Sequence, residues 1–497
     1  MGSRALFRAA GARDREAAHA PRRFSRRRFV QQAGGATAAA MGARLVAAAS
    51  GPQRSQPAAS SDWPRYGCDL HNTRFNRHER TIGPDNVDRL ELKWTFETLD
   101  GWPIQTTPAV VGDALFFGAG GYYYALDRTS GRLKWTFETG LGGDWLASRA
   151  LAGTRSSCEY KDGRLYFGTG LCNVHCLDAS TGKEMWKTSL EGRKEMMASM
   201  MYSPVVHNGK VFVGYSASMA EAACLDAGTG AVRWRFRIVK DVPERYLSGG
   251  GPMWTSGAID EQQNIVINGT GNAKAFAPAG PTLYANSVVA HDADTGELLW
   301  AYQAHPQDAH DLDFCSHPIV FDAVAPPRMR GDVRRVVVAG NKANTVCLNR
   351  HTGELYWKVA FNTPGANSGP LINAMAVADN IVYMQCASPA SQPPMGVTVA
   401  LHGYTGDVVW IVPNPGLQSS PIGVANGVLY QGMTNPAKIE ALSIQNGRRL
   451  WEHALPTPFR GGVAIAGGAV YCTNGASLAW NGERGPFAVH CFTLDGA

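Results

Sequence analysis

The sequence lacks several features that would narrow its class at once. No Cys-x-x-Cys-His motif occurs, which excludes a covalently attached c-type haem. Charged residues make up only 18% of the 497 residues, and no apolar run beyond the N-terminal region is long enough to span a bilayer. Glycine is abundant by contrast, with 56 residues, and apolar residues reach 44%. These values describe a globular chain that is rich in turns.

Positive charge is concentrated at the N-terminus. Residues 1–49 contain ten arginines, one aspartate and one glutamate, a contribution of +8. Since the whole chain carries +6, the remainder carries −2, which gives no electrostatic case for binding nucleic acid. Ser25–Val30 fits a twin-arginine pattern, and an Ala/Gly stretch interrupted by Arg44 leads to a small-residue cleavage site at Ala47–Ala49. We therefore predict a twin-arginine signal peptide over 1–49, no membrane span, and a mature protein in the periplasm or outside the cell; the alternative is a disordered arginine-rich tail.

The ten cysteines all lie beyond residue 60, where an exported chain would be expected to form disulfides. Cys176, Cys224 and Cys347, however, each stand two residues before an Asp or Asn in a repeated strand, at a position that Ala125 occupies in another copy. Cys172 and Cys176 would be about 13 Å apart on one strand, too far to form a bridge. The pattern predicts that most of the cysteines are small buried apolar groups.

A repeated unit is the main signal in the sequence. Its pattern is Ala-Leu-Asp-x-x-x-Gly-x-x-x-Trp, in which Gly makes a tight turn between two strands and Trp can cover the joint between neighbouring units. Asn208-Gly209 is one of several hairpin signals upstream of these turns. The tryptophans of successive units, beginning with Trp94, are 41 to 66 residues apart, which is typical of four-stranded propeller blades. The seven complete units run from Ala125 to Trp135, Cys176 to Trp186, Cys224 to Trp234, Ala290 to Trp300, Cys347 to Trp357, Ala400 to Trp410 and Ala441 to Trp451.

An eighth unit is divided between the two ends of the chain. Cys491–Gly496 matches the first half of the pattern, and Leu90–Trp94 matches the second half. Pairing them would complete one more blade and remove the exposed edge of the sheet. We therefore predict an all-β, eight-bladed β-propeller over 86–497 whose last blade is closed by the N- and C-terminal strands, with a linker and lead-in segment over 50–85.

The repeats and the residues ahead of them resemble the dehydrogenases that use pyrroloquinoline quinone (PQQ). The lead-in carries Trp63–Gly67, Asn72-Thr73-Arg74 and Ile82–Val87, which are similar to the opening of that family and in particular to its polyvinyl-alcohol dehydrogenase branch. The resemblance extends from Trp63 to the end of the chain. It implies tryptophan-docking repeats, a PQQ cofactor and a metal ion. Because propellers of this repeat also serve as scaffolds, the site residues have to decide the function.

Four positions match the family's contacts with the quinone. Trp254, in Gly249–Ser256, resembles the tryptophan that lies beneath the cofactor ring, and it falls outside the repeated blade tryptophans. Arg155, followed by Ser156, matches the arginine that contacts the quinone acid groups, and its fork suits carboxylates. Lys342 resembles the cation beside the reactive carbonyl. For each of them the alternative is an ordinary structural role in the core or at the surface.

The metal ligands implied by the resemblance are Asn272, Asp311, Asp313 and Glu221. Asp311 matches the aspartate that acts as general base and touches the metal, although Asp313 could be the match instead. Two carboxylates at i and i+2 face the same side of an extended strand and resemble the additional aspartate of lanthanide-dependent members, so the metal is Ca²⁺ or a lanthanide. Glu221 is the nearest match to the metal-binding glutamate, with its register shifted. A different interpretation makes a zinc or iron cluster of His310, Asp311, Asp313, Cys315 and His317.

Besides the shifted glutamate, the sequence departs from the family at two further places. The adjacent pair of cysteines that members often stack on the quinone is absent, and Gln105 stands where a glutamate is often found. The function implied is oxidation of a small or polymeric alcohol to an aldehyde or ketone, with electrons passed to a separate cytochrome c or cupredoxin. A cofactor-free propeller acting as a scaffold or sensor, and a metal-dependent enzyme with different chemistry, are the alternatives.

Overall fold

The structure, a computed structural model, divides into two units, Met1–Ser60 and Ser61–Ala497, and everything it describes lies in the second. The described residues are 61–140, 154–170, 172–190, 200–215, 220–238, 252–254, 256–272, 283–306, 308, 312–360, 375–388, 395–415, 420–475 and 485–497. The predicted signal peptide, residues 1–49, lies outside them. Within these ranges, no helix has the length and apolar character that a membrane crossing requires.

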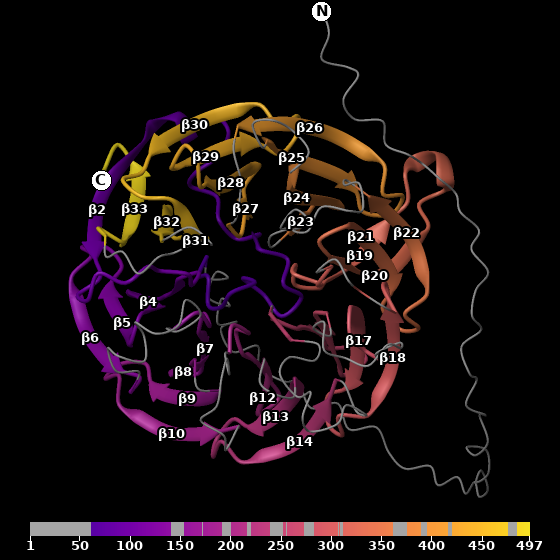
Figure 1. Ribbon diagram of the computed structural model, residues 1–497. Helices are drawn as coiled ribbons and strands as arrows, with labels where there is room; N and C mark the ends of the chain where they lie inside the picture. Colours follow the sequence, from indigo (N-terminus) through magenta and orange to yellow (C-terminus); the bar gives the residue numbers. More distant parts are fainter. Residues whose placement is uncertain are drawn as a thin grey trace, which may run out of the picture. The chain divides into compact units, whose positions relative to one another are not determined.

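Eight sheets are arranged as blades around a ring, each with its first strand toward the centre and its fourth strand at the rim (Figure 1). The first four blades are β3 (Ala109–Val111), β4 (Ala114–Ala119), β5 (Tyr122–Asp127) and β6 (Leu133–Glu138); β7 (Glu159–Lys161), β8 (Arg164–Gly168), β9 (Asn173–Asp178) and β10 (Glu184–Ser189); β11 (Val205–His207), β12 (Lys210–Tyr215), β13 (Glu221–Asp226) and β14 (Val232–Arg237); and β15 (Ala258–Asp260), β16 (Ile265–Gly269), β17 (Ser287–Asp292) and β18 (Leu298–Gln303).

The other four blades follow the same plan. They are β19 (Ile319–Val324), β20 (Val333–Gly340), β21 (Asn344–Asn349) and β22 (Leu355–Ala360); β23 (Ala376–Ala378), β24 (Ile381–Ser388), β25 (Met395–His402) and β26 (Val408–Pro415); β27 (Gly423–Ala425), β28 (Val428–Met433), β29 (Lys438–Ser443) and β30 (Arg449–Ala454); and β31 (Phe459–Ala466), β32 (Ala469–Asn474), β33 (Ala488–Leu494) and β2 (Leu90–Glu97). Short elements are β1 (Phe75–Asn76) and the 3₁₀ turns η1 (Val87–Arg89) and η3 (Pro327–Met329).

The eighth blade is built from both ends of the chain, as the divided repeat predicts. Its strand order is β2-β33-β32-β31, and β2 pairs antiparallel with β33 from Leu90 opposite Leu494 to Glu97 opposite Ala488. The predicted eight-bladed, all-β fold is therefore confirmed.

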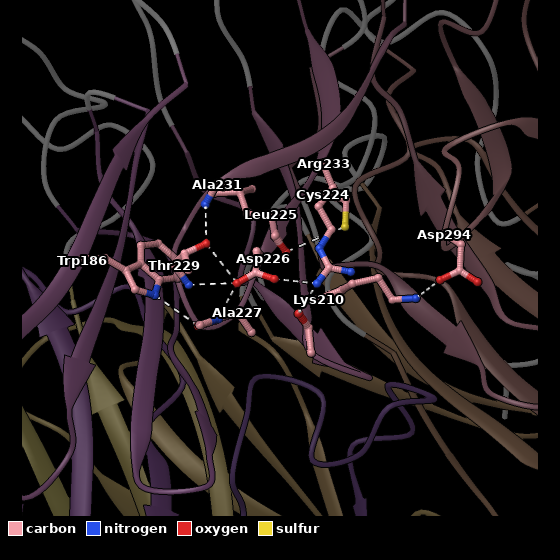
Figure 2. A network of polar contacts seen from close by, with 12 residues as sticks. Trp186, Lys210, Cys224, Leu225, Asp226, Ala227, Thr229, Ala231, Arg233 and Asp294 are labelled. Atoms are coloured by element: carbon pink, nitrogen blue, oxygen red, sulfur yellow. Dashed lines mark hydrogen bonds and ion pairs between the residues drawn. The ribbon is translucent and has the colours of Figure 1, made fainter.

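The repeated tryptophans join each blade to the next. All eight indole N–H groups donate to a backbone carbonyl of the following blade at 2.9–3.3 Å, and the last of these bonds, from Trp451 to the carbonyl of Leu90, completes the circle. Figure 2 shows the joint between the second and third blades, where Trp186 reaches the carbonyl of Ala227. A Cβ on Gly230 would lie 2.6 Å from the Trp186 ring, so the turn glycine also makes room for the indole.

The hairpin and cysteine predictions are also confirmed. Asn208 and Gly209 both have positive φ angles, 47° and 69°, and connect β11 with β12. All ten cysteines are free thiols, and nine of them are buried. Burial raises the pKa of the Cys224 thiol to about 12, as expected for an inert core residue.

Residues 61–76, which we call the axial segment, cross the middle of the ring (Figure 1). Trp63 forms a bridge with Val110 of β3. Carbonyls of the segment accept hydrogen bonds from the second residue of five further innermost strands: Pro64 from Tyr160, Leu70 from Ile259, His71 from Val320, Thr73 from Val377 and Arg74 from Val424, at 2.8–3.0 Å. The predicted boundary at residue 85 therefore does not separate a free linker from the propeller, because this part of the lead-in lies inside the ring.

Side chains link the two remaining blades to the axial segment, the third through Glu159 of the second blade and the eighth through Asn76. In the third blade, Val206 N–H donates to the carboxylate of Glu159 at 3.0 Å, and that carboxylate lies 3.4 Å from the Arg65 guanidinium. Burial raises the pKa of Glu159 to about 7, although Arg65 acts in the opposite direction. In the eighth blade, the amide of Asn76 donates to the carbonyl of Ile465 at 2.7 Å. The segment thus contacts seven blades directly and is linked to the third blade through Glu159 of the second.

Candidate functional site

The residue just before Arg155 and the residue just before Trp254 occupy equivalent places in their blades. In the first four blades, a glycine is the fifth residue of the second strand, and a Cβ added to it would lie 2.1–3.1 Å from one side chain of the next blade. Those side chains belong to Thr154, Met200, Met253 and Phe314. The residues that follow them are Arg155, Met201, Trp254 and Cys315, so these four hold corresponding positions in consecutive blades.

Met201 was not singled out from the sequence, and Cys315 was named only in the alternative zinc or iron cluster. A guanidinium nitrogen of Arg155 lies 3.5 Å from the Met201 sulfur, which joins two of the four corresponding positions directly. The signal that could have identified both residues is the position of the strand glycines. The four residues occupy the same aligned position when the blades are superimposed on Gly118, Gly168, Gly214 and Gly269.

Trp254, Asn272 and Asp313 meet around one glycine. A Cβ on Gly271 would lie 2.4 Å from a carboxylate oxygen of Asp313 and 2.9 Å from the indole nitrogen of Trp254. The backbone N–H of Asn272 donates to Asp313, and the N–H of Gly271 donates to the carbonyl of Pro252 at 2.7 Å. The turn after β16 therefore draws together the segment that carries Trp254 and the segment that carries Asp313.

Lys342 and Asp313 form a buried ion pair. The ammonium nitrogen lies 2.9 Å from Asp313 Oδ2, and the side chains are 9% and 6% exposed. Backbone pairing fixes the approach, because Lys342 N–H donates to the carbonyl of Asp313 at 3.1 Å and Phe314 forms a bridge with Asn341. Removing each ion from water costs several kcal/mol, so a buried ion pair is stable only where mutual attraction and hydrogen bonds offset this desolvation cost.

Two neighbouring residues predicted to bind the cofactor have different surroundings. Arg155 is half-buried, next to Met201. Ser156 is fully buried, and its hydroxyl donates to the carbonyl of Tyr202 at 2.8 Å and accepts from the N–H of Gly168 at 2.9 Å. The Ser156 hydroxyl thus connects the second blade with the third, whereas Arg155 occupies one of the four corresponding positions.

Glu221 lies among cations. It begins β13, accepts a hydrogen bond from the Tyr215 hydroxyl, and lies 3.3 Å from Arg235 and 3.7 Å from Arg237. These partners satisfy its carboxylate within its own blade. Its role as a metal ligand stays a prediction.

Asp311, the predicted general base, lies outside the described residues, as does His310. Among the residues that the structure describes, no group of three or more His, Cys, Asp or Glu side chains is arranged to hold a metal ion. In the alternative zinc or iron cluster, His317 has a different partner: its Nε2 lies 3.0 Å from the carbonyl of Asn72. Burial lowers the pKa of His317 to about 3, so the ring is neutral and Nε2 carries the proton.

The described residues fit a flat anionic cofactor with a hard metal ion. Trp254 supplies an aromatic face, and Lys342 supplies a positive charge. Asn272 and Asp313 supply an amide and a carboxylate, which are the oxygen ligands that Ca²⁺ and similar ions prefer. Gly271 is the point at which three of these groups approach one another, and any larger residue there would fill that space.

Fold and site together define a tryptophan-docked, eight-bladed propeller with a buried cation, a carboxylate and an indole at one position. The family described as "Glucose/ethanol/alcohol dehydrogenase, beta-propeller domain", the PQQ family, matches residues 63–370. The chain belongs to this family, and the resemblance drawn from its repeats is confirmed. The family of the outer membrane protein assembly factor BamB matches residues 285–481.

The relatives are distant. Quinohemoprotein alcohol dehydrogenase from Comamonas testosteroni is 27% identical over 329 residues, which are 58% of this chain and 45% of the relative. Polyvinylalcohol dehydrogenase from Pseudomonas sp. is 26% identical over 486 residues, covering 83% and 73%. The crystal structure of the Comamonas protein has a TM-score of 0.74 at 22% identity, covering 88% of this chain and 82% of that chain, and shows the shared fold. The matched part thus spans about half the length of the Comamonas relative.

Proposed function

We propose that this chain is a PQQ-dependent dehydrogenase that oxidises a small or polymeric alcohol to an aldehyde or ketone. The observation that carries the proposal is the buried pair of Lys342 and Asp313 beside Trp254, in a chain of the PQQ family. A propeller alone would not support it, because the same fold carries unrelated functions. The placement of an ammonium, a carboxylate and an indole at one point is what a scaffold would not need.

PQQ, when bound, supplies a two-electron acceptor, and Ca²⁺ or a lanthanide supplies a Lewis acid. The Trp254 indole is the flat surface on which the ring would lie, and Arg155 would pair with its acid groups. Asn272 and Asp313 would hold the metal. Lys342 is a fixed positive charge in a water-poor site, where it stabilises negative charge that develops on an oxygen far more than it would in water.

The proton of the alcohol hydroxyl requires a base. Both carboxylate oxygens of Asp313 accept hydrogen bonds, from the Lys342 ammonium and from the Asn272 backbone N–H. These bonds orient Asp313 as a metal ligand, and we assign proton acceptance to Asp311, two residues earlier in the chain.

The proposal extends to the cellular context. The twin-arginine pattern over 1–49 supports export to the periplasm or beyond, and this route carries folded proteins, which suits a ring closed by its own ends. Because the sequence contains no Cys-x-x-Cys-His, the electrons would pass to a separate cytochrome c or cupredoxin.

The test is reconstitution of the purified chain with PQQ and either Ca²⁺ or La³⁺, followed by dye reduction with primary, secondary and polymeric alcohols. The proposal predicts alcohol-dependent turnover that requires both the quinone and one of the two ions. Turnover without quinone would instead indicate a metal-dependent enzyme of different chemistry.

A second candidate is a scaffold that binds no cofactor. The match of residues 285–481 to an outer membrane assembly factor favours it. That match covers blades and repeats but leaves out Trp254 and Asn272. Absence of any quinone binding in the same reconstitution would support the scaffold.

A further inference from the structure

The axial segment carries an asparagine at the junction of the two loops that form the candidate site. Asn72 is fully buried and has a φ of 59°, a left-handed conformation that asparagine accepts more readily than most residues. Its amide nitrogen lies 2.7 Å from the carbonyl of Gly257, 3.2 Å from that of Ser256 and 3.3 Å from that of Pro318. One amide therefore contacts the loop before β15 and the loop before β19.

Those two loops hold the site residues. Ser256 and Gly257 follow Trp254 by two and three residues, and Pro318 follows Asp313 by five. The backbone of Asn72 adds a third connection, because its carbonyl accepts a hydrogen bond from His317 Nε2 at 3.0 Å.

A second network supports the Trp254 loop from the other side. The Tyr202 hydroxyl accepts from the N–H of Gly257 and donates to the side chain of Asn268, each at 2.7 Å. Both groups are buried. Gly257 is therefore held at its N–H by Tyr202 and at its carbonyl by Asn72, which leaves the loop little freedom to move relative to β16.

We propose that Asn72 is a positioning residue that sets the separation of Trp254 and Asp313, and hence the shape of the site. The inference deepens the proposed function and depends on it only for the identity of the ligand. Buried hydrogen bonds that orient site residues commonly change affinity or activity tenfold or more when removed, although they contact no ligand.

The chain supplies a matched control. Asn76 belongs to the same axial segment, is 2% exposed, and its amide also contacts three carbonyls, those of Ser61, Asp62 and Ile465, at 2.7, 3.4 and 2.7 Å. It connects the axial segment with the eighth blade and contacts neither loop of the site. Asn72→Ala and Asn76→Ala thus each remove an amide that contacts three carbonyls in the same segment, and Asn76→Ala also removes the oxygen that accepts from the His78 N–H.

The experiment compares the two variants in three measurements. The melting temperature should fall by similar amounts in both variants. Hydrogen exchange should increase over 252–257 and 313–318 only in Asn72→Ala. The affinity for PQQ with Ca²⁺ should fall about tenfold or more in Asn72→Ala, with a shifted absorbance band of the bound quinone, and stay within about twofold of the wild type in Asn76→Ala.

Asn72→Gly also removes the amide, but glycine adopts positive φ without strain. This variant therefore distinguishes loss of the amide from backbone strain, and it serves as the test if the alanine variant does not fold. Equal exchange over the two loops in the Asn72 and Asn76 variants, or equal quinone affinity, would overturn the inference. Absence of quinone binding by the wild type would instead refute the proposed function, and the exchange comparison would still decide whether Asn72 holds the loops.

Discussion

At the rim of this propeller every blade makes the same contact, whereas one set of corresponding positions holds a different side chain in each of the first four blades. Eight tryptophans donate to eight carbonyls in one geometry at the rim. Around the axis the corresponding positions hold Arg155, Met201, Trp254 and Cys315. A repeated contact stabilises the architecture, and an unrepeated residue at a repeated position is free to serve chemistry. The comparison separates the two roles within a single chain.

The largest expected effect comes from the charge near the axis. Lys342→Ala should reduce kcat/KM for the alcohol roughly a thousandfold, since it removes a preorganised charge in a dry site. Lys342→Arg should recover part of the loss because the charge returns. Steady-state dye reduction measures both.

The second strand of the third blade offers a lysine as the control for this substitution. Lys210 is 4% exposed and pairs with Asp294, as Figure 2 shows. Lys210→Ala should leave kcat/KM within about twofold of the wild type, because Asp294 is exposed and water replaces the lost partner. A comparable loss in both variants would show that the effect is structural.

Two tryptophans provide the next contrast. Trp186→Ala should lower the free energy of unfolding by about 3 kcal/mol, since a large side chain is removed from a blade joint, and should leave PQQ affinity unchanged. Trp254→Ala should weaken the binding of the quinone and lower the free energy of unfolding by less than Trp186→Ala does. Denaturant unfolding and quinone titration of both variants check this, and parallel changes in both would contradict a division between rim and axis.

A pH-dependent effect is expected at the axis. The pKa of Glu159 is raised to about 7 by burial, from an unfolded value near 4.5, so the folded chain binds more protons between these values. Its contribution to stability is present at low pH and is lost as the pH rises toward about 7. Relative to Glu159→Gln, the wild type should lose about 3 kcal/mol of unfolding free energy between pH 4.5 and 7. A difference that does not vary with pH would show that Arg65 compensates for the burial.

The smallest effect is expected at the rim, where Asp226 is held by Arg233 and by turn N–H groups (Figure 2). The hydrogen bond from Arg233, followed by the turn N–H of Thr229, lowers the pKa of Asp226 to about 2. The sign is opposite to that of Glu159, because this stability is present above the unfolded pKa and is lost as the pH falls toward 2. Asp226→Asn should cost less than about 1 kcal/mol at pH 7, since the pair is exposed. Urea unfolding at pH 7 and pH 3 measures the change, which should shrink at the lower pH.

The sequence predicted the rim well for a physical reason. Each blade joint depends on a turn glycine and a tryptophan at a fixed spacing, so local patterns contain nearly all the information. The divided eighth blade followed from the same pattern, since Leu90–Trp94 and Cys491–Gly496 are complementary halves. Free cysteines followed from their place in the repeated strands.

The axis could be predicted only in part. Trp254, Asn272 and Lys342 were found by resemblance, and the structure brings the segments that carry them together through Asp313 and Gly271. The hydrogen bonds of the axial segment could not be anticipated, because its residues find partners as distant as the 389 positions between Asn76 and Ile465. The pairing of Glu221 with Arg235 was missed for a related reason, since it depends on cross-strand register.

The most direct test of the account is a calorimetric titration of PQQ into the purified chain in the presence of Ca²⁺, alongside Trp254→Ala and Trp186→Ala. The account predicts one site per wild-type chain, the same site in Trp186→Ala, and binding that is at least tenfold weaker in Trp254→Ala. Equal binding by all three proteins, or none by the wild type with either Ca²⁺ or La³⁺, would contradict a quinone site at the axis.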